Sequence, residues 1–121
     1  MLSYRIDGAI LVLTAARGPQ RQEVFDAVHA DPRVPQGALV LIDARAAEPA
    51  RSELEVRERA RVLVNRLGSK VGAVCAVIVA PELALDAHLF QVFGSGLGLR
   101  VGLFPDEPTA RQWLEAYLPQ S

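Results

Sequence analysis

Extended apolar runs alternate along the chain with amphipathic segments of helical periodicity. The apolar runs span residues 9–14, 38–42, 73–79 and 100–104, and a helix-like segment follows each of them. Parallel strands need crossover helices between them, and strands covered on both faces consist almost entirely of Val, Ile and Leu. The pattern therefore predicts an α/β domain with a mainly parallel sheet.

The N-terminal residues predict an antiparallel strand pair ahead of the parallel units. Residues 4–6 and 9–13 flank Asp7-Gly8, a dipeptide typical of tight hairpin turns because it tolerates positive φ. The expected fold class is a five-stranded mixed sheet, mainly parallel, in which successive βα units follow the hairpin and about four helices cover the sheet. A chain of this length predicts a single domain over residues 1–121.

Capping signals predict where the helices begin and end. Pro19 favours the start of the first helix, in which Val24, Ala27 and Val28 would face the sheet. Ser52 and Glu55 have the spacing of a capping box, and Gly68 is expected to end that helix in a left-handed conformation. Asp106 is expected to cap the last helix. The second helix would turn one stripe toward the sheet, formed by Val56, Ala60, Leu63, Val64 and Leu67.

Composition and charge exclude several function classes. Half of the residues are hydrophobic and the formal net charge is −1, so the chain is expected to fold and to have no bulk attraction for nucleic acid or an anionic membrane. No apolar run approaches the roughly 18 residues of a membrane span, and the N-terminal residues lack the pattern of a secretory signal. We therefore expect a cytoplasmic protein that binds neither membrane nor nucleic acid.

The residues that catalysis or metal binding would need are scattered along the chain. Cys75 lies inside an apolar strand, where burial raises the pKa of a thiol. His29 and His88 are separated by a whole βαβ unit, without the spacing of a metal site. The glycine-rich residues 94–98 follow a helix and precede a strand, which is the reverse of the order in a phosphate-binding loop. We expect no enzyme activity, no cofactor and no metal.

The best candidate position for function lies after the 38–42 strand, because open α/β sheets bind ligands at the carboxyl ends of their strands. Asp43 ends this strand, Arg45, Arg51 and Ser52 follow it, and Arg17 follows the preceding strand. These five residues are the candidate binding residues. An alternative is that Asp43 only accepts backbone N–H groups in its own turn. A weaker alternative is an enzyme that uses Asp43 with Arg45.

The third helix, expected from Pro81 to Phe93, carries two apolar stripes where a helix on one face of a sheet needs one. The first stripe consists of Leu83, Ala87, Phe90 and Gly94. The second stripe consists of Leu85, Leu89, Val92 and Phe93. This second stripe either lies under neighbouring loops or forms an interface with a partner or a second copy of the chain.

Two stretches resemble the STAS-like proteins, small bacterial domains related to the anti-sigma-factor antagonists. They are residues 40–45 (VLIDAR) and residues 100–106 (RVGLFPD), the latter followed by Ala110 and Trp113-Leu114. The order and spacing of elements are similar over most of the chain. The resemblance implies an initial strand pair followed by right-handed βα units. It also implies a non-catalytic function in which the protein binds other proteins.

The resemblance also implies a phosphorylated hydroxyl that this sequence lacks. In the antagonists a serine or threonine follows the strand-ending Asp and is phosphorylated by a partner kinase. Asp43 matches the acid, but Ala44 and Arg45 occupy the positions where the hydroxyl would be. The nearby Ser52 is expected to be occupied as a helix cap. The phosphorylation switch therefore does not carry over.

Two functional hypotheses follow. The leading one is a non-catalytic, STAS-like regulatory module that lacks the usual phosphoacceptor and docks onto a protein partner through residues 43–52, or that forms a homodimer. The other is a small-molecule carrier, in which Arg17, Arg45 and Arg51 would pair with an anionic head group above an apolar, lipid-like pocket under the third helix.

Overall fold

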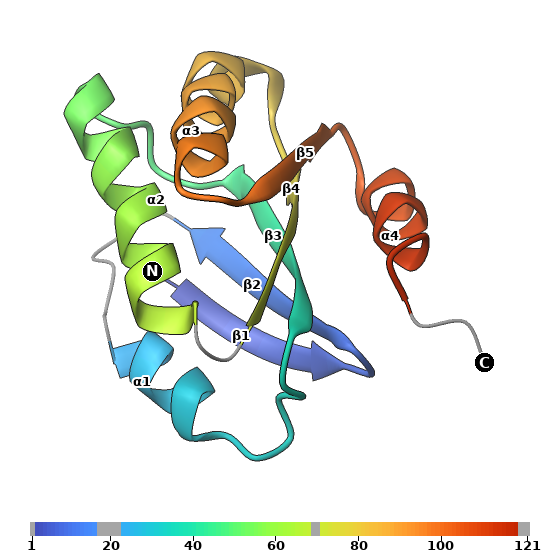
Figure 1. The fold of residues 1–121 in the computed structure, drawn as a ribbon. Coiled ribbons are helices and arrows are strands. Elements are labelled where there is room, and N and C mark those ends of the chain that lie inside the picture. Colours follow the sequence, from blue (N-terminus) through green and yellow to red (C-terminus); the bar gives the residue numbers. More distant parts are fainter. Residues whose placement is uncertain (1, 17–22, 69–70, 119–121) are drawn as a thin grey trace.

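The chain forms one five-stranded sheet with helices against both of its faces, as described in a computed structural model for residues 2–16, 23–68 and 71–118 (Figure 1). The strands are β1 (Leu2–Asp7), β2 (Ile10–Ala16), β3 (Ala38–Ala46), β4 (Val71–Ile78) and β5 (Arg100–Phe104). The helices are α1 (Glu23–Ala30), α2 (Glu53–Leu67), α3 (Ala84–Gly96) and α4 (Glu107–Glu115), with a 3-10 turn, η1 (Pro81–Leu83), leading into α3.

The strands lie in the sheet in the order in which they occur in the chain. β1 pairs antiparallel with β2, and each later strand pairs parallel with the one before it. This arrangement confirms the predicted fold class, a mixed and mainly parallel sheet that begins with a hairpin. The carboxyl ends of β2, β3, β4 and β5 consequently lie along the same edge of the sheet.

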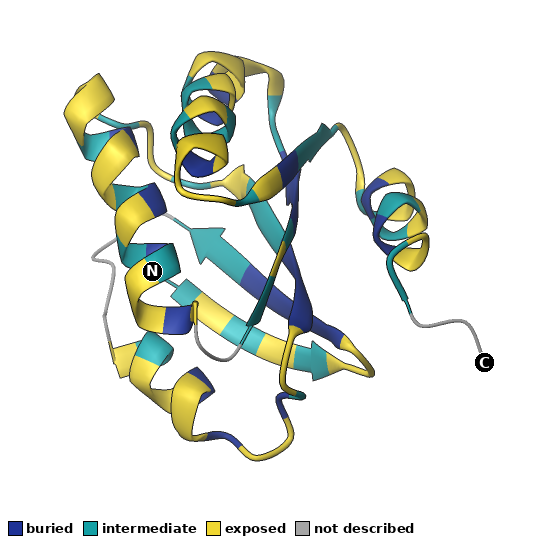
Figure 2. Cartoon of the chain, in the orientation of Figure 1, coloured by how far each residue is buried: buried dark blue, intermediate teal, exposed yellow. Residues whose placement is uncertain are grey.

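Two apolar cores lie on opposite faces of the sheet. On one face, side chains from β2 to β5 pack against Val28 of α1 and against Leu63 and Leu67 of α2, with Phe90 of α3 alongside. On the other face, a second cluster packs against Ala110 and Leu114 of α4. Figure 2 shows that the buried residues concentrate in the central strands and on the helix surfaces that face them.

The hairpin turn is one residue later than predicted. Asp7 still pairs with Ile10, so the turn residues are Gly8 and Ala9. Gly8 has a φ of 61°, which glycine adopts without steric cost. Asp7 therefore completes the strand register, and Gly8 supplies the unusual backbone conformation.

The boundaries of α2 confirm one predicted cap and correct another. The Ser52 Oγ accepts the N–H of Glu55 at 3.3 Å, as predicted, but the Glu55 carboxylate accepts the N–H of Arg51 at 3.3 Å, where the capping box required that of Ser52. The prediction of a left-handed Gly68 is wrong. Its φ is −59°, because the backbone stays helical and the Gly68 N–H donates to the carbonyl of Val64. Val56, Ala60, Leu63 and Leu67 form the buried stripe, with Val64 partly covered.

The remaining helices agree with the sequence in part. Asp106 caps α4 as predicted, and its Oδ1 accepts the N–H of Thr109 at 2.9 Å. Val28 of α1 is buried as expected, whereas Ala27 is exposed, since α1 turns only a narrow side toward the sheet. The predicted helix start at Pro19 lies outside the described residues. The α3 helix continues to Gly96, three residues beyond the predicted end at Phe93.

A buried carboxylate that sequence reasoning missed ties the end of α1 to the edge strand β1. Asp31 accepts hydrogen bonds from the Tyr4 hydroxyl at 2.9 Å and from the Arg33 Nη2 at 2.8 Å. The side-chain hydrogen bonds from Arg33 hold the pKa of Asp31 well below its usual range. The same contact with Asp31 raises the pKa of Tyr4. This cluster supports the loop between α1 and β3 at the amino end of the parallel strands.

Candidate functional site

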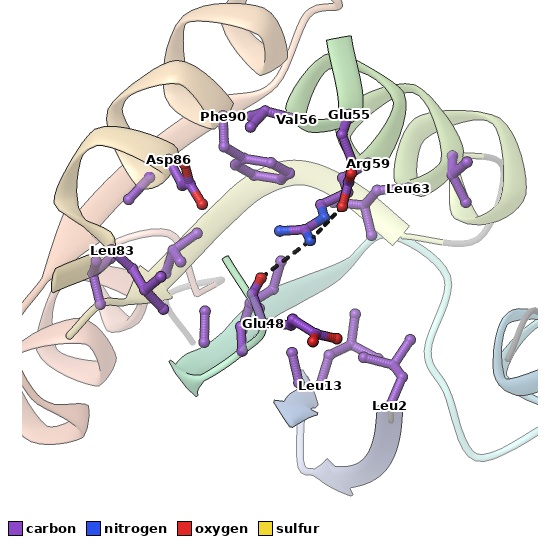
Figure 3. Close-up of a pocket in the computed structure, with 18 of the residues that line it drawn as sticks. Leu2, Leu13, Glu48, Glu55, Val56, Arg59, Leu63, Leu83, Asp86 and Phe90 are labelled. Carbon is purple, nitrogen blue, oxygen red and sulfur yellow. Dashed lines mark hydrogen bonds and ion pairs between the residues drawn. The ribbon is translucent and has the colours of Figure 1, made fainter. Parts of the chain in front are cut away.

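A cavity of about 500 Å³ opens at the carboxyl ends of β2, β3 and β4, between the sheet and helices α2 and α3 (Figure 3). Alternate residues of a strand point to the same face, so β2 and β3 each contribute two side chains to the cavity floor, while β4 contributes Val77 and the residue after the strand, Val79, continues the floor. The floor is formed by Leu13, Ala15, Ile42, Ala44, Val77 and Val79. The volume lies within the range of about 300 to 1,000 Å³ that is usual for small-molecule sites.

The walls of the cavity come from helix residues one turn apart. Val56, Arg59 and Leu63 line it from α2, while Ala87 and Phe90 line it from α3. Residues spaced by three or four lie on one side of a helix, so both helices present a continuous side to the cavity. The cavity lies under the third helix, where the carrier hypothesis expects an apolar pocket.

Polar side chains gather at one side of this largely apolar cavity. Arg59 donates through Nη2 to the Glu55 carboxylate at 3.0 Å and to the backbone carbonyl of Glu48 at 3.1 Å. The Asp86 Oδ2 accepts the N–H of Ala50 at 2.8 Å. These bonds fasten the loop between β3 and α2 to both walls of the cavity.

Glu48 projects from this loop over the cavity. Figure 3 shows its backbone carbonyl directed toward Arg59 and its carboxylate directed toward the side formed by Leu13. Within the described part of the chain, no donor contacts the Glu48 carboxylate. Glu48 therefore differs from Glu55 and Asp86, whose carboxylates accept hydrogen bonds from the protein itself.

The structure places Asp43 and Arg45 away from this cavity. Asp43 does not end the strand as predicted, because β3 continues to Ala46. Its neighbours Ile42 and Ala44 line the cavity, so strand alternation turns Asp43 and Arg45 to the opposite face.

The Asp43 carboxylate is engaged locally by Arg45. The Arg45 Nε and Nη2 donate to it at 3.0 and 2.7 Å, and the Arg45 backbone N–H donates at 3.2 Å. The side-chain hydrogen bonds from Arg45 lower the pKa of Asp43. The backbone bond agrees with the alternative in which Asp43 serves its own segment, although that segment is a strand and not a turn.

The other candidate binding residues do not gather around the cavity either. Arg51 is exposed, and Ser52 is engaged as the cap of α2. Arg17 lies outside the described residues. The expected cluster of arginines for an anionic head group is therefore not formed by its two described members, Arg45 and Arg51, neither of which lines the cavity.

The two apolar stripes of α3 have different environments. Leu83, Ala87 and Gly94 of the first stripe are buried, as expected for the side that faces the sheet. In the second stripe, Leu89 and Phe93 are half-buried, and the Arg57 guanidinium lies 4.9 Å from the centre of the Phe93 ring. Leu85 and Val92 remain exposed, at 71% and 52%.

The remaining reactive side chains stay apart from the cavity. Cys75 is buried within β4, and this burial raises the pKa of its thiol to about 12. His29 and His88 are exposed on separate helices. Among residues 2–16, 23–68 and 71–118, no group of three or more His, Cys, Asp or Glu side chains is arranged to hold a metal ion. None of the described helices is both long and apolar enough to cross a membrane.

Comparison with known proteins identifies no relative of this chain. No protein-family model matches the sequence, and neither the curated proteins nor the solved structures contain a match to it.

Proposed function

We propose that the protein is a non-catalytic binding module that holds a small, largely apolar ligand in the cavity at the carboxyl ends of β2, β3 and β4. The observation that carries this proposal is the cavity of about 500 Å³ itself, whose floor is aliphatic and whose walls include Phe90 and Leu63. A concave, apolar site with a few polar groups on one side is typical of small-molecule binding.

The expected affinity follows from the burial of an alkyl chain. Each methylene transferred from water contributes about 0.8 kcal/mol, so an eight-carbon chain gains about 6 kcal/mol. Association costs at least about 4 kcal/mol of lost translational and rotational freedom. The remaining gain of about 2 kcal/mol corresponds to a Kd of some tens of millimolar for a simple alcohol of this length, and a natural ligand that also satisfies the polar groups would bind more tightly.

Filling the cavity should abolish binding of an apolar probe. Ala87→Phe introduces a ring from the α3 wall, and we expect it to weaken 1-octanol binding at least about tenfold because the ring occupies the same volume. Amide chemical shifts in a 15N-labelled sample report both the site and the Kd. In the wild-type protein, octanol should shift the amides of Ala44 and Ala87.

Ala84→Phe is the matched control, since Ala84 is an exposed residue of the same helix. This variant should bind octanol like the wild-type protein. Ala47→Phe fills the cavity from the loop side and provides a second test if Ala87→Phe does not fold. The proposal is wrong if octanol leaves the cavity amides unshifted, or if both filled variants bind it as well as the wild-type protein does.

A second candidate function is self-association in a STAS-like regulatory module, and one observation favours it. Leu85 and Val92 are seven residues apart on α3, so they lie on the same side of the helix, and both are exposed. Large apolar side chains exposed together often mark an interface. We propose that a second copy of the chain covers them, in keeping with the STAS-like resemblance.

Charged substitutions in this stripe test the second candidate. Light scattering should give the wild-type protein a mass that rises with concentration toward that of a dimer, while the double variant Leu85→Glu/Val92→Glu stays monomeric because dimer formation would bury its charges. Leu54→Glu changes an equally exposed leucine on α2 and should behave like the wild-type protein. A wild-type protein that is monomeric at every concentration would rule out this interface.

A further inference from the structure

We propose that the cavity selects ligands with a cationic group at one end of an apolar body, with a long-chain primary amine as the simplest example. This inference rests on the proposed function and specifies the chemistry of the ligand. It replaces the anionic head group of the sequence-based hypothesis, because the described residues that line the cavity carry an excess of negative charge, the same sign as that head group.

Carboxylates outnumber cations among the described residues that line the cavity. Arg59 is the single cationic residue of that lining, and the acidic residues are Glu48, Glu55, Glu58 and Asp86. At neutral pH these groups have a formal excess of negative charge. Glu48 and Glu58 are exposed to solvent, and such an excess at the cavity mouth favours cations over carboxylate or phosphate groups at the same place.

The cation in the lining is already engaged by the protein. Arg59 donates to the Glu55 carboxylate at 3.0 Å and to the Glu48 carbonyl at 3.1 Å. An anionic head group would have to compete with Glu55 for this guanidinium and would also meet the remaining carboxylates. The cavity therefore offers no uncommitted arginine within the described residues that line it.

Most of the carboxylates in the lining already contact donors of the protein itself. Glu48 is therefore the described group that can accept a hydrogen bond from a ligand. Asp86 accepts the N–H of Ala50 at 2.8 Å, and Glu58 lies 3.8 Å from Arg61. No described residue donates to the Glu48 carboxylate. A protonated amine provides up to three donors for such an oxygen pair, and a charge-assisted bond of this kind is stronger than a neutral one.

The position of Glu48 allows the charged and apolar parts of one ligand to be satisfied together. Figure 3 shows the carboxylate over the cavity near Leu13, with Phe90 on the far wall and Leu2 at the border. An ammonium group beside Glu48 would keep access to water at the loop. Its alkyl chain would extend over the aliphatic floor toward Phe90.

Three probes with the same eight-carbon chain separate charge from burial. At pH 7, octylammonium should bind about tenfold more tightly than octanoate, with 1-octanol between them. Added salt should reduce the difference, because it screens charges at the cavity mouth. The Kd values are measured by amide shifts, as for octanol above.

A charge-neutral variant tests the assignment to Glu48. Glu48→Gln keeps the shape of the side chain and should weaken octylammonium binding about fivefold while leaving octanol binding unchanged. Glu115→Gln removes the same charge from an exposed position on α4, against the other face of the sheet, and should leave both affinities unchanged.

Each outcome has a distinct meaning. If octanol and octylammonium bind equally well, or octanoate binds best, the cationic preference is refuted while the apolar binding function stands. If Glu48→Gln leaves octylammonium binding intact, the assignment to Glu48 is refuted. If none of the three probes shifts the cavity amides, the proposed function and this inference both fall.

Discussion

Replacing Leu114 with alanine is expected to lower the free energy of unfolding by about 3 kcal/mol. Leu114 is fully buried in α4 and packs in the cluster that includes Leu41 and Ile78 from the central strands. Removing its branched end leaves a cavity between helix and sheet that rigid strands cannot close. Urea unfolding followed by far-UV circular dichroism measures the change.

Leu54→Ala is the matched control for this prediction, because it removes the same atoms from a side chain that is 69% exposed. Its effect should stay within about 0.5 kcal/mol. Leu114→Ala should still bind octanol when folded, since the ligand cavity lies on the other face of the sheet. Equal losses of stability in the two variants would contradict the role of α4 as the cover of this face.

The fold could be predicted from the sequence because its signals are local and repeated. A run such as residues 38–42 is apolar on both faces, and only a strand between two helical layers buries all of it. The predictions that were wrong concern backbone conformation and burial at positions where tertiary contacts, and not the local sequence, determine the outcome. Gly68 has no side-chain constraint of its own, and the hydrogen bond to Val64 keeps it helical. Ala27 is compatible with either environment, and the placement of α1 leaves it exposed.

The candidate site was predicted less well, because it is assembled from side chains far apart in the sequence. Asp43 was chosen because it follows a strand, but whether a residue there faces the cavity depends on the register of β3. The strand continues past Asp43, and its alternation brings Ile42 and Ala44 to the cavity. The cavity does lie under the third helix, where an apolar pocket was expected, but its lining there comes from the first stripe, through Leu83, Ala87 and Phe90, and not from the additional apolar stripe.

The sequence contains almost no signal that predicts the charged side of the cavity. The spacing of Glu55 and Arg59, four residues apart on α2, favours an ion pair between them, and that pair is present, but the second bond of Arg59, to the Glu48 carbonyl, depends on the loop conformation. Asp86 reaches the backbone of Ala50, 36 residues earlier. An acidic residue after a strand and another at the start of the third helix are too common to indicate a site by themselves.

The thiol of Cys75 is expected to react with Ellman's reagent at pH 8 about a thousandfold more slowly in the folded protein than in urea. The thiol is buried out of reach of the reagent, and burial also raises its pKa to about 12, so very few folded molecules hold the reactive thiolate at this pH. An unfolded cysteine, with a pKa of about 8.5, is about one-quarter thiolate under the same conditions. Because the folded-state pKa is the higher one, raising the pH from 8 to 10 should increase the folded rate far more than the unfolded rate.

A surface thiol supplies the comparison, and the destabilised variant shows how the buried thiol is reached. Ser95→Cys in a Cys75→Ala background places a cysteine at an exposed position of α3 and should react rapidly without urea. If modification of Cys75 requires global opening, Leu114→Ala should accelerate it about a hundredfold, since 3 kcal/mol raises the unfolded population by that factor. An unchanged rate in Leu114→Ala would mean that β4 is exposed by a local opening that leaves α4 in place. A native rate close to that of the surface thiol would contradict the burial of Cys75 altogether.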